Sequence, residues 1–207
     1  YTVVNPIVYN RAYNVLKGTP TLSFTSSATT NYDYGTSTTL TGNGCPTQGA
    51  GDVTCRFYID GVAQTPGNTI SDLALNAGVH VISYNSTSGS NWTIGGFRSD
   101  ITVNKNTAVL SLSILPSTAV NQGMQTNATG SNCPSELTCA LTRNGASVTN
   151  SDIQTLGVGT YVYNYSTAGN ANYNPSSITQ TLTVTPDATN PVISNINVNP
   201  SSPATYN

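Results

Sequence analysis

Four cysteines are the residues whose spacing points most clearly to chemistry. They form two pairs at equivalent places in two copies of a repeat: Cys45 with Cys55, and Cys133 with Cys139. A disulfide within each copy would close a short hairpin-like loop and contribute roughly 2–3 kcal/mol. Free thiols or metal ligation are the alternatives, but neither pair has the CxxC spacing of a zinc site. We therefore predict two local disulfides in an oxidising compartment.

Four Asn-x-Ser/Thr tripeptides are candidate sites for N-linked glycans: Asn85, Asn91, Asn127 and Asn164. Such tripeptides also arise by chance in a chain rich in Asn, Ser and Thr, so unmodified strand and turn residues are the alternative. Strand phase turns Asn127 and Asn164 towards solvent, because the neighbours of each are expected to face inward. Glycans there would hydrate a surface that has few charges.

Catalytic chemistry has little support. The single histidine, His80, occupies the strand position that Tyr161 takes in the other copy, which favours packing over catalysis. Asp72 and Asp152 also repeat in position, which favours turn capping, since one acid per copy cannot supply a glycosidase pair. No nucleophile or phosphate-binding motif occurs. We expect no catalytic residue, no cofactor and no enzyme activity.

Metal binding and covalent crosslinking are also weakly indicated. Calcium held by Asp60, Asp72 or Asp100 with backbone carbonyls is an alternative, but no dense acidic cluster supports it, and we predict no metal site. Lys17 and Lys105 recur where one copy meets the next. The chain contains a single Glu to promote Lys–Asn crosslinks, so solvated linker lysines are favoured.

Composition narrows the class of protein further. Charged residues make up 7% of the 207 residues, against about a quarter in average soluble domains, which is typical of a secreted polar β-protein. A net charge of −2 provides no basic face for nucleic acid and no polybasic membrane anchor. No apolar run reaches the roughly 20 residues that cross a bilayer, and no signal peptide is recognisable, so we expect a processed or cropped piece without membrane insertion.

A repeated stretch reveals the elements that must position these residues. Its copies are GVHVISYNSTSGSNW from Gly78 and GTYVYNYSTAGNANY from Gly159. Alternation in the second copy places Tyr161, Tyr163 and Tyr165 on one strand face, which we interpret mainly as core, with sugar stacking as the alternative. Upstream, Asp60-Gly61 and Asn144-Gly145 are hairpin signals. About seven short strands per copy predict a β-sandwich.

The second copy, with its run GTYVYNYSTAGNANYNPSS, upstream Asn-Gly turn and closing TLTV strand, resembles the tandem bacterial and archaeal Ig-like repeats of large surface proteins. The resemblance covers residues 17–186 and implies an all-β fold of tandem Ig-like β-sandwiches. Such repeats serve as adhesin stalks, surface-layer parts and filament subunits, so the resemblance specifies architecture better than function. The paired cysteines depart from the common pattern.

Four segments follow from the repeat. Residues 1–16 are expected to be end strands of a preceding unit or a donor strand, residues 17–104 and 105–186 two Ig-like domains, and residues 187–207 the opening strand of a following unit. We expect a non-enzymatic extracellular structural protein that forms or decorates a microbial surface fibre, with self-association as its main partner interaction. Residues 2–8, TVVNPIV, are the candidate donor strand for a neighbour. The alternative is an adhesin, or a carbohydrate- or protein-binding module on a stalk, using the loop 46–54.

Overall fold

The computed structural model describes residues 14–46 and 53–188, all of whose regular elements are β-strands. The chain divides into two compact units, the first comprising Tyr1–Ala108 with Ala168–Ser176 and the second Val109–Thr167 with Ser177–Asn207. The candidate donor strand and most of the 46–54 loop lie outside the described residues.

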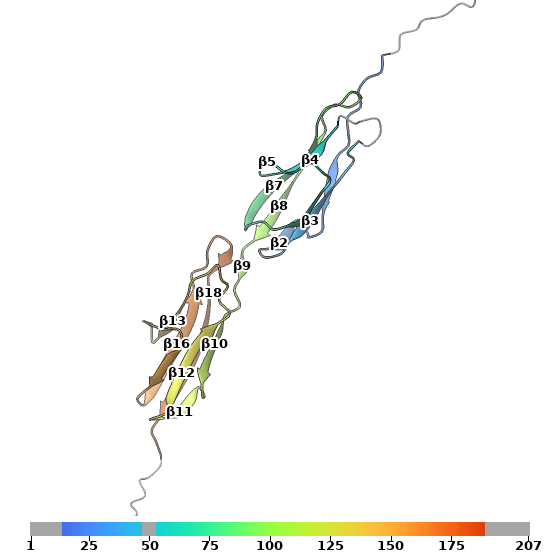
Figure 1. Cartoon of the computed structure of the whole chain (residues 1–207). Helices are drawn as coiled ribbons and strands as arrows, with labels where there is room; N and C mark the ends of the chain where they lie inside the picture. Colours follow the sequence, from blue (N-terminus) through green and yellow to red (C-terminus); the bar gives the residue numbers. More distant parts are fainter. Residues whose placement is uncertain (1–13, 47–52, 189–207) are drawn as a thin grey trace, which may run out of the picture. The chain divides into compact units, whose positions relative to one another are not determined.

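The first unit contains a three-stranded and a five-stranded sheet (Figure 1). The smaller sheet has the order β1 (Ser23–Ser26), β3 (Thr38–Asn43), β6 (Thr69–Leu73). The larger has the order β2 (Asn31–Asp33), β8 (Gly96–Asn104), β7 (Gly78–Ser86), β4 (Cys55–Ile59), β5 (Val62–Ala63). Only the β2–β8 pairing in these two sheets is parallel. A short parallel pair, β9 (Asn106–Thr107) with β17 (Tyr173–Asn174), completes the unit.

The second unit repeats this strand order. Its smaller sheet has the order β10 (Ser111–Leu115), β12 (Gln125–Ser131), β15 (Asp152–Thr155). Its larger sheet has the order β11 (Ala119–Asn121), β18 (Ser176–Thr185), β16 (Gly159–Thr167), β13 (Cys139–Arg143), β14 (Ala146–Val148), with β11 and β18 parallel. Apolar side chains of both sheets form the core in each unit. The predicted all-β, Ig-like β-sandwich is confirmed.

Two tight turns have the conformation that the sequence predicts. Asp60 and Gly61 connect β4 to β5 with φ of 50° and 81°, and Asn144 and Gly145 connect β13 to β14 with φ of 49° and 80°. Positive φ at both central residues defines the type I′ turn. The turn also reaches the neighbouring strand, because Oδ1 of Asp60 accepts a 2.8 Å hydrogen bond from the backbone N–H of Val81.

A tyrosine ring lies against a glycine across the sandwich in both units. A Cβ atom at Gly42 on β3 would lie 2.3 Å from Cζ of Tyr84 on β7, and one at Gly130 on β12 would lie 2.4 Å from Cδ2 of Tyr165 on β16. These distances are far below van der Waals contact, so only glycine leaves room for the ring at its present position.

The other tyrosines of β16 divide between core and surface. Tyr163 and Tyr165 are buried, whereas Tyr161 is only half-buried. The tyrosine face of this strand is therefore core over two of its three positions.

We expect Gly130→Ala to destabilise the second unit by about 1–3 kcal/mol, because the added methyl group must displace the Tyr165 ring. Differential scanning calorimetry would measure the loss. Gly157→Ala is the matched control, since its Cβ would meet only the Tyr161 hydroxyl, at 4.0 Å. Equal transition temperatures for the two variants would show that the ring is not tightly packed on Gly130.

Candidate functional site

The two disulfides bridge the sheets of each unit. Cys45 is joined to Cys55 with a Cα–Cα distance of 6.1 Å, and Cys133 to Cys139 with a distance of 6.2 Å. Cys45 follows β3 of the smaller sheet, whereas Cys55 begins β4 of the larger one. The expectation of a hairpin-like loop is wrong, because the linked strands belong to different sheets. Each bond instead fixes the connection between the two layers.

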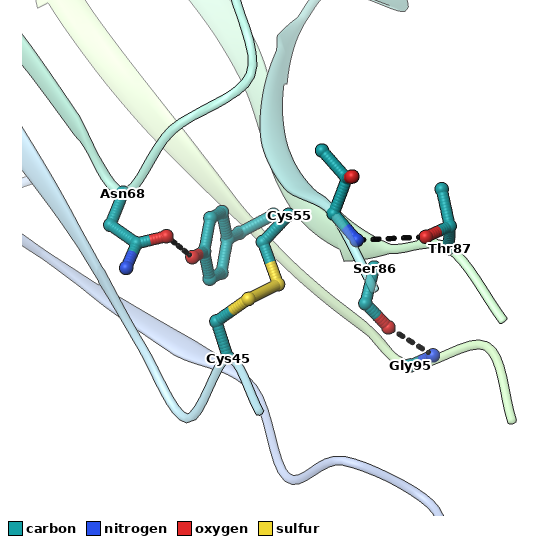
Figure 2. Close-up of a disulfide and its surroundings, with 8 residues drawn as sticks. Cys45, Cys55, Asn68, Ser86, Thr87 and Gly95 are labelled. Carbon is teal, nitrogen blue, oxygen red and sulfur yellow. Dashed lines mark hydrogen bonds between the residues drawn. A yellow bond between two sulfur atoms is a disulfide. The ribbon is translucent and has the colours of Figure 1, made fainter. Parts of the chain in front are cut away.

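Polar groups around the first disulfide are occupied by structural hydrogen bonds (Figure 2). The Tyr84 hydroxyl donates to Oδ1 of Asn68 at 2.5 Å, and the backbone N–H of Gly95 donates to Oγ of Ser86 at 2.9 Å. Oγ1 of Thr87 accepts from the backbone N–H of Thr54 at 2.9 Å. These side chains hold loops in place around the Cys45–Cys55 bond.

His80 and Tyr161 perform the same structural task. The Tyr161 hydroxyl donates to the carbonyl oxygen of Gly157, four residues upstream, at 3.0 Å. Nε2 of His80 lies 2.9 Å from the carbonyl oxygen of Asn76, also four residues upstream. Both residues therefore tie the start of a central strand to the preceding loop, as a tyrosine corner does. This shared contact explains why histidine and tyrosine interchange here.

His80 differs from Tyr161 in having a charged neighbour. Its Nδ1 lies 2.7 Å from Oδ2 of Asp60, so both ring nitrogens face oxygen acceptors, and the protonated ring, with its two donors, satisfies both of them. Burial lowers the pKa of His80, but the hydrogen bonds to Asp60 and Asn76 and the attraction of Asp60 outweigh burial, so the pKa is raised overall. The hydrogen bond from His80 is the main reason that the pKa of Asp60 is lowered.

A buried polar cluster in the second unit was missed by the sequence analysis. Asp152 is buried and accepts from Nη1 of Arg143 at 2.5 Å and from the Tyr163 hydroxyl at 2.9 Å. Nε2 of Gln154 donates to its other oxygen at 3.1 Å. Burial raises the pKa of Tyr163, so its hydroxyl remains a donor. The interpretation of Asp152 as a turn cap is wrong, because its carboxylate is held inside the sandwich.

Asp72 and Asp152 repeat in the sequence, but they do not occupy equivalent positions in the strand pairing. Asp152 pairs with Ala128, whereas Leu40, the counterpart of Ala128, pairs with Ile70. The register between β3 and β6 shifts nearby, and the extra length places Asp72 on the surface with a φ of 51°.

The first unit has isoleucine at each corresponding position of this cluster: Ile59, Ile70 and Ile82, in place of Arg143, Asp152 and Tyr163. The same sandwich thus accommodates either an apolar trio or a hydrogen-bonded ion pair. Such an exchange is consistent with the near balance between desolvation and attraction in buried ion pairs. The cluster is consequently no evidence of catalysis.

The two recurring lysines fasten loops. Nζ of Lys17 donates to the carbonyl oxygen of Gly89 at 2.7 Å, and Nζ of Lys105 donates to that of Asn170 at 2.8 Å. Both lysines are exposed, as expected of solvated lysines, and each ammonium group also satisfies a loop carbonyl. Equivalent lysines make equivalent contacts, which identifies a repeated structural device.

The four sequons occupy different settings. Asn85 lies on β7, Asn127 on β12 and Asn164 on β16, while Asn91 lies in the loop between β7 and β8. Asn127 and Asn164 are half-buried and alternate with buried neighbours along their strands. Oδ1 of Asn164 lies 3.4 Å from the donating hydroxyl of Thr179. Glycosylation at the four asparagines stays a prediction.

Among residues 14–46 and 53–188 no cluster of three or more His, Cys, Asp or Glu residues could hold a metal ion. These residues also form no helix of the length and apolarity that crossing a membrane requires.

Comparisons with known proteins add little beyond the fold. No protein-family model matches the chain, and no curated protein matches it. Solved structures with some likeness include fibronectin(III)-like modules of Clostridium thermocellum CbhA (10% identity, TM-score 0.30, covering 79% of this chain and 95% of that one). Murine CEACAM1b has 10% identity and a TM-score of 0.30, covering 80% of this chain and 100% of that one.

Three N-terminal domains of the bacteriophage RB49 outer capsid protein Hoc have 12% identity and a TM-score of 0.31, covering 81% of this chain and 59% of that one. At such scores these likenesses carry no argument about function. The Ig-like class follows from the strand order of each unit.

The His80 contacts predict a pH dependence of the first unit. Because the folded-state pKa of His80 is raised, its contribution is fully present below about pH 6.5 and is lost as the pH rises through the folded value. We expect the free energy of unfolding to fall by about 0.5–1 kcal/mol between about pH 6 and pH 9. Urea unfolding followed by fluorescence of Trp92, the single tryptophan, reports on this unit.

His80→Tyr is the matched control for this measurement, because the second unit shows that tyrosine can make the same backbone contact. The variant should lose the pH dependence between these two values. An identical dependence in the wild type and in His80→Tyr would assign the effect to another group.

Proposed function

We propose that this chain is a non-enzymatic, extracellular structural protein whose Ig-like units carry tension in a fibre or stalk on a microbial surface, with self-association as its main partner interaction. The observation that carries the proposal is the parallel pairing of β2 with β8 and of β11 with β18. In each unit this pairing joins a strand near the beginning of the sandwich to its last long strand.

Parallel pairing determines how such a unit responds to force. When two parallel strands are pulled from opposite ends of the chain, they slide along each other, so their hydrogen bonds are loaded together. In the first unit Thr102 donates to the carbonyl of Thr30 at 2.8 Å and Tyr34 donates to that of Asn104 at 2.9 Å. A unit connected in this way resists stretching better than one whose hairpin opens one bond at a time.

The second unit has the same parallel pairing between β11 and β18, and we call this pairing in each unit the parallel clamp. The backbone N–H of Thr183 donates to the carbonyl of Thr118, and that of Gln122 donates to the carbonyl of Thr185, both at 2.8 Å. Oγ1 of Thr185 adds a bond to the carbonyl of Val120 at 3.3 Å. Tension along the chain loads both units in series, so the presence of the clamp in both favours a load-bearing role.

Other features support an extracellular setting and self-association. Disulfides are typical of extracellular domains, and the described residues contain no free cysteine. Among the described strands, β5 and β14 lie at one edge of the larger sheets, and such an edge can pair with another strand. Val62 on β5 is 65% exposed. The resemblance to microbial surface repeats supports the same setting.

Single-molecule stretching of the whole chain tests the mechanical part of this proposal. Gln122 and Gly123 form the centre of a turn in which Gly123 has a φ of 89° and Met124 donates to the carbonyl of Asn121. A turn with positive φ at its third residue accepts proline at its second residue. Gln122→Pro therefore suits the turn but removes the N–H that bonds to Thr185.

We expect Gln122→Pro to lower the unfolding force of the second unit and leave that of the first unchanged. Gln122→Ala, which keeps the N–H, should behave as the wild type. The units can be distinguished by reduction, because opening a disulfide releases the enclosed chain less the distance that the bond already spans, which adds about 30 Å for the 10-residue and about 15 Å for the 6-residue separation. Equal forces for Gln122→Pro and Gln122→Ala would rule out this clamp.

A further inference from the structure

The outer face of the smaller sheet in the second unit has a hollow of about 520 Å³. Six residues of β10, β12, β15 and the adjoining loop form its walls: Leu115, Pro116, Gln125, Thr126, Asn127 and Ile153. One of these residues, Asn127, is also the acceptor asparagine of a sequon. The hollow and the candidate modification site therefore coincide.

Asn127 is flanked by two exposed apolar side chains. It pairs with Leu115 on one neighbouring strand and with Ile153 on the other, so the three residues form one row across the sheet. Leu115 is 60% exposed and Ile153 is 53% exposed. Because adjacent strands are about 4.8 Å apart, the apolar residues stand about 10 Å apart with Asn127 between them.

The Asn127 side chain is held by the threonine of its own sequon. The hydroxyl of Thr129, two residues along the same strand face, donates to Oδ1 of Asn127 at 3.2 Å. An N-linked sugar is bonded to Nδ2, where it replaces one hydrogen.

The first unit provides an internal comparison. The counterpart of Asn127 there is Thr39, and its neighbour in the position of Leu115 is Ser27. Exposed Ser71 and Asp72 lie where the second unit has Ile153. The apolar flanks therefore accompany the sequon and are replaced by polar residues where the sequon is missing.

We propose that Asn127 carries an N-linked glycan whose first sugar lies in this hollow, with the apolar C–H face of its ring against Leu115 and Ile153. In the transfer step Nδ2 forms a bond to C1 of a sugar carried by a lipid-linked phosphate donor. The bond from C1 to the phosphate oxygen breaks, the phosphate leaves with the electron pair, and the amide loses one proton to a base of the transferase. The inference rests on the proposed extracellular setting, because such transfer accompanies export.

The same sugar satisfies the polar part of the hollow. The Gln125 side chain is exposed beside Asn127 and can exchange hydrogen bonds with ring hydroxyls. A pyranose thus matches both the apolar flanks and the polar wall. Covering Leu115 and Ile153 removes apolar surface from water, which stabilises the second unit.

The test uses the full chain secreted from a glycosylating eukaryotic host and trimmed by an endoglycosidase to one N-acetylglucosamine per site. Peptide mass spectrometry measures occupancy, and calorimetry measures the transition temperature of the second unit. Four proteins form the comparison: wild type, Asn127→Gln, Leu115→Ser/Ile153→Ser and the triple variant. The same four made without N-glycosylation provide the reference for the substitutions alone, and Thr129→Ser provides a variant that keeps the sequon.

We expect Asn127 to be occupied in the wild type and in Thr129→Ser. Loss of its sugar should lower the transition temperature by about 4 °C when Leu115 and Ile153 are present, and by much less when both are serine. An unmodified Asn127 alongside a modified Asn85, Asn91 or Asn164 would overturn this inference alone. Modification at none of the four would overturn the inference too, and it would leave the proposed extracellular setting unaffected, because the host imposes the secretion.

Two other results would also overturn the inference. An equal loss of stability with and without the apolar flanks would show that the sugar does not occupy the hollow. Concentration-dependent association of the glycosylated wild type that Leu115→Ser/Ile153→Ser abolishes would assign the hollow to a second copy of the chain. Analytical ultracentrifugation of the same samples measures this association, and equal association of the wild type and Leu115→Ser/Ile153→Ser is the expected result.

Discussion

The contact between a tyrosine ring and a facing glycine determines how closely the two sheets of each unit approach. Tyr84 lies over Gly42 and Tyr165 over Gly130, in both cases joining a central strand of the larger sheet to the middle strand of the smaller one. The ring fills the space that two ordinary side chains would occupy, and a Cβ atom at either glycine would overlap it. The disulfides and the parallel clamps add further connections to two sheets whose spacing depends on this contact between tyrosine and glycine.

The outline of the fold could be predicted from local patterns. Alternation of apolar and polar residues predicted the strands, and Asp60-Gly61 and Asn144-Gly145 predicted the turns, because positive φ has a direct sequence signature. Pairing of cysteines within each copy followed from the repeat. Tyr163 and Tyr165 were expected in the core for the same reason, since period-two alternation specifies a face.

Features that depend on register could not be predicted in this way. Asp72 and Asp152 look equivalent in sequence, but a register shift between β3 and β6 leaves one on the surface while the other is buried with Arg143 and Tyr163. The hollow beside Asn127 was hidden for a related reason, since Leu115 and Ile153 are distant in sequence and become its neighbours only through strand pairing. A bulge or a cross-strand row leaves no local signature.

The two units show which parts of the design are fixed and which are free. Type I′ turns, disulfides between sheets and parallel clamps recur, whereas the residues at the His80 position and at the Arg143–Asp152–Tyr163 cluster change. The recurring features connect the two sheets of each sandwich and its early strand to its last long strand, and the proposed structural role is built on them. The most direct measurement is electron microscopy of the surface of producing cells, with antibody labelling of this chain. We expect label at regular intervals along fibres or stalks; label confined to dispersed, soluble molecules would contradict the proposed role.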